Sequence, residues 1–286
     1  MSPDTLTAPS AAQIAGDVER ALAEDLGSGD ATAELLPDEA RAEATLTCRE
    51  SAMIAGIPWF DACVRRMDPS ARIDWHTADG QRVAAGTLIC HLDGRARALV
   101  SAERSALNFL QLLSGTATQT AEYVAAVAGT GVRVLDTRKT VPGLRLAQKY
   151  AVRCGGGHNH RMGLHDAILV KENHIIAAGG IAAAVQAARR LHPQLLLEVE
   201  VENLDELAQA LAAGVDRVLL DNFSLPLMCA AVRQAAGRVP LEASGNVDLH
   251  TIGDYARTGV DFISVGALTK HVRAVDLSLR LRLRLG

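Results

Sequence analysis

The pattern of apolar and polar residues changes character near residue 131. Before that point, residues 11–26 place apolar side chains on one face at helical spacing and predict a surface helix. Residues 40–50 alternate apolar and polar side chains and predict a half-exposed strand, and 58–67 predict a second helix. Residues 71–94 predict two strands joined by tight turns. Short strands joined by turns indicate an antiparallel sheet.

A long helix is predicted over residues 102–128, with an interruption near Ser114–Gly115 and Ser101 as a candidate N-cap. This start places Arg104 in the first turn, where a cation opposes the helix dipole. Arg104 is therefore either an ordinary surface residue or one that reaches an anion held elsewhere, and the pattern leaves both open.

From residue 131 onward, apolar runs alternate with helical segments, which predicts a parallel sheet with right-handed crossovers. The runs are 131–136, 167–171, 195–202, 216–222, 239–246 and 261–267. A complete eight-unit barrel needs about 250 residues, and this part of the chain is far shorter. We therefore expect an incomplete, six-strand barrel. The tail, residues 270–286, alternates Leu and Arg and predicts either an edge strand that returns to the N-terminal sheet or a fraying terminus.

Composition narrows the class of protein. Apolar residues make up 49% of the chain and aromatic residues 3%, which suits Ala-, Leu- and Val-rich helices packed on a parallel sheet. No run of 18 apolar residues occurs, so no membrane span is expected. The five cysteines are scattered and form no CxxC motif, which is typical of reduced thiols and predicts a cytoplasmic location.

A basic block lies between residues 138 and 171, where Asp166 is the only acidic residue, although the chain has a net charge of −4. A local basic block on an acidic background favours a small-anion site over a nucleic-acid surface. Charges at the carboxyl ends of buried strands are costly unless they face a site. We therefore assign function to Arg138, Lys139, His160, Arg161 and Lys171. A further set at i, i+4, i+8 predicts an exposed helical stripe: Arg145, Lys149 and Arg153.

The later strand ends carry two further kinds of group. Glu200 and Asp221 could hold sugar hydroxyls directly or through Mg²⁺. Two small-residue loops, Ser244–Gly245–Asn246 and Val265–Gly266–Ala267, could cradle a phosphate with free backbone N–H groups. For Glu198 and Glu202 we expect solvent exposure or salt bridging.

Three chemistries could use this set of residues. One is glycosyl transfer from a phosphorylated ribose donor. Another is Schiff-base chemistry by Lys171, which needs an apolar setting. The third is metal-dependent hydrolysis with His158 and His160, although these histidines lack carboxylate or Cys ligands at the usual spacing.

The basic block and the later strand ends also resemble the motifs of a known protein family. The run DTRKTVPGLRLAQKYAVRCGGGHNHRMGLHDAILVKENH, with EVEVEN, LLLDNF, LEASGNV and GVDFISVGALTKHV, resembles the quinolinate phosphoribosyltransferase family, and the resemblance covers essentially the whole chain. It implies an N-terminal α/β sandwich domain (1–113, with the tail 270–286 returning to it) and an open, incomplete six-strand α/β barrel of the type II phosphoribosyltransferase kind (114–269).

The resemblance also implies a reaction. Quinolinate and phosphoribosyl pyrophosphate would give nicotinate mononucleotide, pyrophosphate and CO2 in NAD biosynthesis, with Mg²⁺. It implies a homodimer or higher oligomer, with Arg104 donated across the interface and no nucleic acid or membrane as partner.

The resemblance assigns residue roles by motif position. Lys139, Lys171, Glu200 and Asp221 match the catalytic residues, and Glu200 and Asp221 also match the metal and ribose carboxylates. The two small-residue loops match the 5′-phosphate site. The resemblance also implies a binding pocket for the substrate carboxylates and phosphates, formed by Thr137, Arg138, Lys139, His160, Arg161 and Lys171. Three alternatives stay open: a relative with the same fold but another acceptor, a Schiff-base lyase that uses Lys171, and a silent phosphosugar-binding protein.

Overall fold

The computed structural model describes residues 6–284, and residues 1–5 and 285–286 lie outside the described part. Contacts divide the chain into two units. The first comprises Met1–Ala121, Val141–Gly156 and His271–Gly286, and the second Glu122–Thr140 and Gly157–Lys270. The predicted fold class, a mixed α/β domain followed by an unclosed parallel six-strand sheet, is confirmed.

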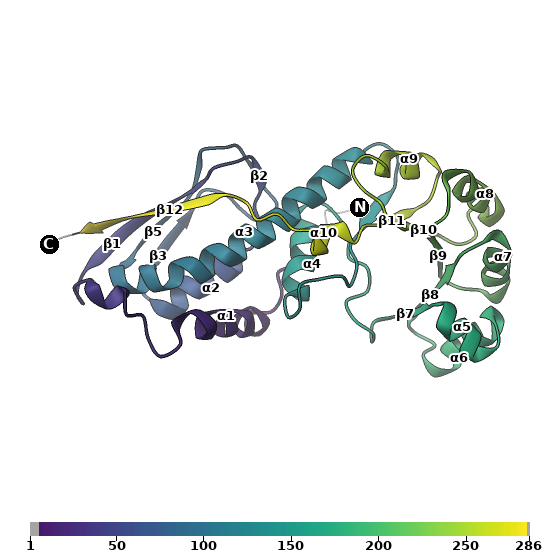
Figure 1. Ribbon diagram of the computed structural model, residues 1–286, viewed down its shortest axis with the longest axis horizontal. Helices are drawn as coiled ribbons and strands as arrows, with labels where there is room; N and C mark the ends of the chain where they lie inside the picture. The colour runs from purple at the N-terminus through teal and green to yellow at the C-terminus, as the bar shows by residue number, and fades with distance from the viewer. Residues whose placement is uncertain (1–5, 285–286) are drawn as a thin grey trace. The chain divides into compact units, whose positions relative to one another are not determined.

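The first unit is built on an antiparallel sheet in the order β12-β1-β5-β3 (Figure 1). Its strands are β1 (Arg41–Cys48), β3 (Arg72–Trp75), β5 (Thr87–Arg95) and β12 (Leu277–Arg284), and a separate two-strand pair joins β2 (Ala52–Met53) to β4 (Arg82–Val83). The tail forms β12, paired with β1 along its full length. The two predicted helices are present as α1 (Ala11–Leu26) and α2 (Ile57–Met67). A capping box between Ser10 and Gln13 stabilises the N-terminus of α1. A short 3-10 turn, η1, covers Ala33–Leu35.

The long helix differs from the prediction at its start and in its middle. Helix α3 runs without interruption over Ala96–Ala126. Ser101 does not cap it, since its hydroxyl donates to Arg97 O and Asp30. Tertiary contacts support the helix where local propensity predicts a break: Ser114 Oγ bonds the backbone of Ala55. Arg104 therefore lies well inside the helix, and the argument that it opposes the dipole is wrong.

Helix α4 (Arg145–Cys154) also corrects a prediction. The basic stripe is not solvent-exposed, because Lys149 has 0% exposed surface and Arg145 and Arg153 are half-buried. The helix packs into the core of the first unit, where the Tyr150 ring lies 5.7 Å from that of Trp59. Spacing along a helix defines a stripe, but tertiary packing decides whether solvent reaches it.

The buried carboxylate of Asp68 holds the end of β5, directly before α3 begins. Asp68 has 1% exposed surface and accepts hydrogen bonds from Arg95 N, Ser70 N and Ser70 Oγ. Burial alone would raise the pKa of Asp68, but these donors outweigh burial and lower its pKa below the usual value.

The second unit is a parallel sheet in the order β6-β11-β10-β9-β8-β7, with β6 and β7 as unjoined edges. The strands are β6 (Arg133–Leu135), β7 (Ala167–Val170), β8 (Leu196–Val201), β9 (Arg217–Asp221), β10 (Leu241–Ser244) and β11 (Phe262–Ser264). The helices are α5 (Glu172–Ala178), α6 (Ile181–Leu191), α7 (Leu204–Ala213), α8 (Leu225–Ala235), α9 (Ile252–Arg257) and α10 (Ala267–Lys270). All six apolar runs are strands, as predicted.

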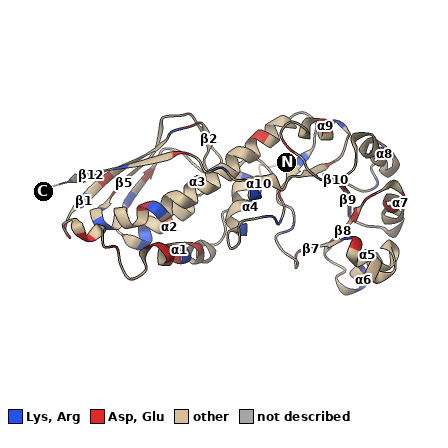
Figure 2. Cartoon of the chain, viewed as in Figure 1, with Lys and Arg blue, Asp and Glu red and all other residues tan. Residues whose placement is uncertain are grey.

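Charged residues lie on barrel strands as well as on the helices (Figure 2). Polar side chains on inner strands of a barrel mark a site rather than a plain apolar core. All five cysteines are free of disulfides. Among the described residues, no helix combines the length and apolarity that a bilayer crossing requires.

Candidate active site

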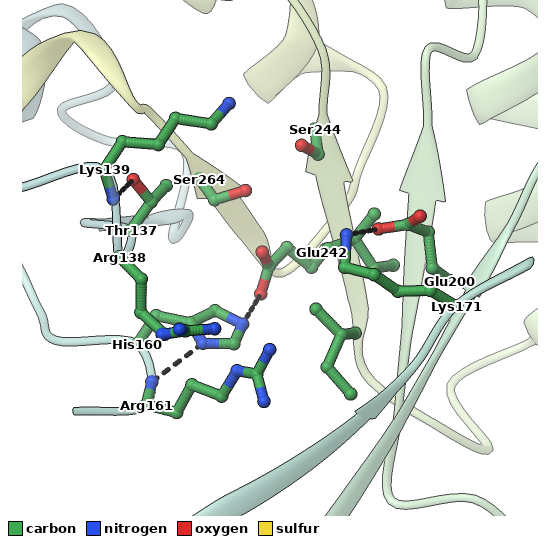
Figure 3. A pocket seen from close by; sticks show the side chains of 12 residues that line it. Thr137, Arg138, Lys139, His160, Arg161, Lys171, Glu200, Glu242, Ser244 and Ser264 are labelled. Atoms are coloured by element: carbon green, nitrogen blue, oxygen red, sulfur yellow. Dashed lines mark hydrogen bonds and ion pairs between the residues drawn. The ribbon is translucent and has the colours of Figure 1, made fainter. Parts of the chain in front are cut away.

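A cavity of about 240 Å³ opens at the carboxyl ends of the barrel strands. Figure 3 shows its side chains, with His160, Arg138 and Arg161 on one side and Lys171 and Glu200 on the other. The strands position these groups because successive parallel strands present their carboxyl ends at one face. The lining residues are Thr137, Arg138, Lys139, His160, Arg161, Leu169, Lys171, Glu200, Leu219, Glu242, Ser244 and Ser264.

The cavity has more cationic groups than the protein neutralises. Within residues 6–284, Arg138, Lys139 and Arg161 have no carboxylate partner at ion-pair distance. Arg138 Nε is buried without a hydrogen-bond acceptor in the described structure. Burial, and then the charge of Arg138, lower the pKa of the Arg161 guanidinium from its ordinary value. Half-buried guanidinium groups that repel each other indicate a place for an anion.

Lys171 lies directly after β7 and pairs with Glu200 on β8, with 2.7 Å between Nζ and Oε2. The side chain of Lys171 is 48% exposed. A Schiff-base lysine is usually desolvated in an apolar pocket. The exposed and ion-paired setting of Lys171 suits binding of an anion better than nucleophilic attack.

His160 is held against two buried glutamates. Its Nε2 lies 2.9 Å from Glu198 Oε2 and 3.4 Å from Glu242 Oε2, while its Nδ1 accepts a 2.7 Å hydrogen bond from the N–H of Arg161. Burial disfavours the charged ring, but the two neighbouring glutamates outweigh burial and raise the pKa of His160 to about 9. The Arg161 N–H opposes a second ring proton, since it occupies the lone pair on Nδ1.

Of the two glutamates expected to be exposed or salt-bridged, Glu198 and Glu202, only Glu198 is buried. Glu198 has 1% exposed surface, so of the two predicted alternatives only ion pairing holds for it, whereas Glu202 is exposed. Burial raises the pKa of Glu198. The pKa of Glu242 is lowered despite burial, chiefly by its hydrogen bond to His160.

The loop after β10 has a constrained backbone. Gly245 has φ +114°, and a Cβ there would lie 2.3 Å from Asn222 Oδ1. Only glycine fits this position without displacing Asn222. Asp221 ends β9 beside Ser244 in register, and Asn246 follows with φ 47°.

The loop after β11 lies beside Lys139. A Cβ on Gly266 would lie 3.0 Å from Lys139 Cδ, so the glycine leaves room for that side chain. Val265 N donates to Leu135 O, and Ala267 begins α10. Ser244 lines the cavity, whereas Asp221, Gly245, Asn246, Val265, Gly266 and Ala267 lie at the same strand ends outside its lining.

Two carboxylates at this face could hold a magnesium ion. Glu200 and Asp221 end the neighbouring strands β8 and β9 and are both half-buried. Mg²⁺ prefers one or two carboxylates and completes its shell with water and substrate phosphates. Lys171 engages one oxygen of Glu200, and Asn222 one of Asp221, which leaves the other oxygens available. The donor set therefore fits Mg²⁺.

Two further candidates, Arg104 and His158, are also absent from the cavity lining. Arg104 is exposed on α3 in the first unit. His158 makes a backbone bridge to Leu135, and the cluster of possible metal ligands within the described residues joins His160 to Glu198 and Glu242 instead. The structure thus gives no support to a His158–His160 metal pair.

Sequence reasoning missed four lining residues: Leu169, Leu219, Glu242 and Ser264. Each lies two positions before a strand-end residue that was singled out, on the same strand face. Glu198 precedes Glu200 in the same way. The period-2 rule, applied backward from each strand end, could have found them.

Two family models match consecutive stretches of the chain. Residues 30–114 match the family model "Quinolinate phosphoribosyl transferase, N-terminal domain", and residues 116–280 match "Quinolinate phosphoribosyl transferase, C-terminal domain".

Relatives match over nearly the whole chain. A "Probable nicotinate-nucleotide pyrophosphorylase [carboxylating]" from Synechocystis sp. is 44% identical over 91% of this chain and 90% of its own. A "Nicotinate-nucleotide pyrophosphorylase [carboxylating]" from Mycobacterium leprae is 41% identical over 92% and 95%. The solved structure of the nicotinate-nucleotide pyrophosphorylase from Francisella tularensis is 49% identical, superposes with a TM-score of 0.95, and covers 98% of this chain and 99% of that one.

Proposed function

Since this chain belongs to the quinolinate phosphoribosyltransferase family, we propose that it transfers the phosphoribosyl group of phosphoribosyl pyrophosphate to quinolinate. The products are nicotinate mononucleotide, pyrophosphate and CO2, a step of NAD biosynthesis. The observation that carries the proposal is the cavity with three cations that lack carboxylate partners in the described structure.

Charge explains the composition of the cavity. Quinolinate has two carboxylates, and the donor has a phosphate and a pyrophosphate. Arg138 and Arg161, with His160 beside them, hold the carboxylates, because a guanidinium fork matches a carboxylate. Lys139 and Lys171 hold donor phosphates as mobile point charges. Without this positive charge, the two anionic reactants would repel each other.

The chemistry then needs little more than positioning. The pyridine nitrogen attacks the anomeric carbon of ribose as pyrophosphate leaves. Glu200 and Asp221 stabilise the positive charge that develops on the sugar. The quaternised ring accepts the electron pair of the C2–carboxylate bond as CO2 departs, and C2 then takes a proton. Lys139 and Lys171 are the ammonium groups of the cavity lining that can supply it, and no covalent bond to the protein is required.

Magnesium, assembly and location complete the proposal. Glu200 and Asp221 would hold Mg²⁺, which supplies positive charge to the pyrophosphate leaving group when bound. The enzyme acts in the cytoplasm as a homodimer, in which Arg104 of one protomer completes the cavity of the other. Arg104 is exposed on α3 and has no carboxylate partner at ion-pair distance within residues 6–284, which supports that role.

Turnover of defined substrates tests the proposal. The purified chain is supplied with phosphoribosyl pyrophosphate, Mg²⁺ and either pyridine-2,3-dicarboxylate or nicotinate, and pyrophosphate and CO2 are measured. We expect consumption of the dicarboxylate only. Preference for nicotinate would favour a relative with another acceptor, and donor binding without turnover would favour a silent binding protein. Borohydride trapping of a substrate on Lys171 would favour a Schiff-base lyase.

A further inference from the structure

The ring of His160 lines the cavity, yet both of its nitrogens contact the protein. Nε2 faces Glu198 and Glu242, and Nδ1 accepts from the N–H of Arg161. The backbone N–H of His160 donates to Asp136 Oδ1 at 2.9 Å. The residue is therefore fixed at its main chain and at both ends of its ring. Figure 3 shows the contacts of the ring with Arg161 and Glu242.

The two glutamates come from strands β8 and β10, on either side of β9. Both are buried, with 1% and 0% exposed surface. Arg217 on β9 lies 3.3 Å from Glu242 Oε2, and its guanidinium stacks on the Phe262 ring at 4.2 Å. The one ion-pair partner of Glu198 in residues 6–284 is His160.

Two buried carboxylates beside a histidine are an unfavourable way to stabilise a fold. Burying a carboxylate costs several kcal/mol, and apolar residues often replace buried ion pairs without loss. A carboxylate below an anion pocket also repels the ligand. The cost has a physical rationale when the charges orient a group that contacts the substrate.

We propose that Glu198 and Glu242, with Arg217 behind Glu242, are positioning residues that hold the His160 ring in the orientation required for recognition of the substrate carboxylates. The inference rests on the proposed function, because it deepens the role of the same cavity. Glu198 lies outside the cavity lining and acts only through His160.

A double-mutant cycle tests this role. Glu198→Gln keeps the side-chain volume and removes the charge. We expect it to raise KM for pyridine-2,3-dicarboxylate by about 10- to 100-fold, because displacement of a binding group by about 1 Å has effects of that order. KM for phosphoribosyl pyrophosphate should stay within about twofold, since the donor contacts other groups. In a His160→Ala background, Glu198→Gln should cause little further change.

Glu242→Gln should behave as Glu198→Gln does. The matched control is Glu122→Gln, an exposed carboxylate on α3, which should leave both KM values unchanged. Equal losses from Glu198→Gln with and without His160 would overturn the proposal, as would an unchanged KM for the dicarboxylate. A transition metal that copurifies with the wild-type chain and is lost in Glu198→Gln would also overturn it, since the three side chains would then be ligands.

A second measurement needs no glutamate variant to fold. In wild-type protein labelled with ¹⁵N-histidine, His160 is identified by the signals missing from His160→Ala. We expect a proton on Nε2, and an unprotonated Nε2 would refute the contact with the glutamates. If the wild-type chain consumes no dicarboxylate, the proposed function fails. The NMR measurement would still test whether Glu198 and Glu242 hold the His160 ring.

Discussion

Arg138 provides the sharpest test of the anion cavity. It follows β6 and lines the cavity, and its Nε is buried without an acceptor in the described structure. Arg138→Met keeps an unbranched apolar stem and removes the charge. A structural arginine and a ligand-binding arginine respond differently to this change, so one variant separates the two roles.

The expected loss of kcat/KM follows from the free-energy cost of removing one charged partner of a bound anion. Removing one partner of a buried charge pair typically costs about 2–5 kcal/mol. At about 1.4 kcal/mol for each factor of ten, kcat/KM for pyridine-2,3-dicarboxylate should fall by about 30- to 4,000-fold. Stability should not fall with it, because Arg138 has no carboxylate partner to lose within residues 6–284 and Met leaves no unpaired donor.

Steady-state kinetics and thermal unfolding together are the assay. In the wild-type protein, the dicarboxylate should raise Tm by mass action, and this shift should be absent in Arg138→Met. The control is Arg190→Met, an exposed arginine on α6, which should change neither quantity. A variant with lowered Tm and near-normal kcat/KM would refute the reasoning, because Arg138 would then serve the fold.

Three further predictions concern the interface, the first unit and a loop. An exchanged equal mixture of Arg104→Ala and Lys171→Ala chains should regain about a quarter of wild-type activity, because half of the dimers contain one intact site; no recovery in a heterodimer verified by mass would exclude the shared site. Asp68→Asn should reduce the free energy of unfolding by about 1–3 kcal/mol at pH 7. Because the folded pKa of Asp68 is lowered, this difference should be complete above about pH 4, the unfolded pKa, and disappear as pH falls through the folded value, as urea unfolding at several pH values can test. Gly245→Ala should raise KM for phosphoribosyl pyrophosphate and destabilise the loop by about 1–3 kcal/mol, and Asn222→Ala should recover part of the loss by removing the clash; no recovery would leave backbone strain as the whole cause.

The sequence was informative where structure depends on local pattern. Alternation of apolar runs and helices predicted the six barrel strands. The residues singled out at the strand ends lie at the carboxyl-terminal face of the parallel sheet. Five of the residues singled out in the basic block, from Arg138 to Lys171, line one cavity. This success has a simple cause, since the carboxyl ends of parallel strands must meet.

Prediction failed where the outcome depended on contacts distant in sequence. The interruption expected at Ser114–Gly115 is absent because the backbone of Ala55 satisfies the Ser114 hydroxyl. Lys149 lies on a helix stripe that spacing alone predicts to be exposed, yet packing buries it. Neither the contact of Ser114 with Ala55 nor the burial of Lys149 could be identified from the neighbouring residues in the sequence.

The sequence by itself determined the order of elements, the open barrel and the excess of positive charge near the strand ends. Only the tertiary structure decided which charges are neutralised inside the protein. Glu242 and Glu198 reach His160 because β8 and β10 flank β9 in the sheet and present both carboxylates to the same imidazole ring. A linear pattern records which face of a strand a residue occupies, but not which residue of another strand shares its surroundings.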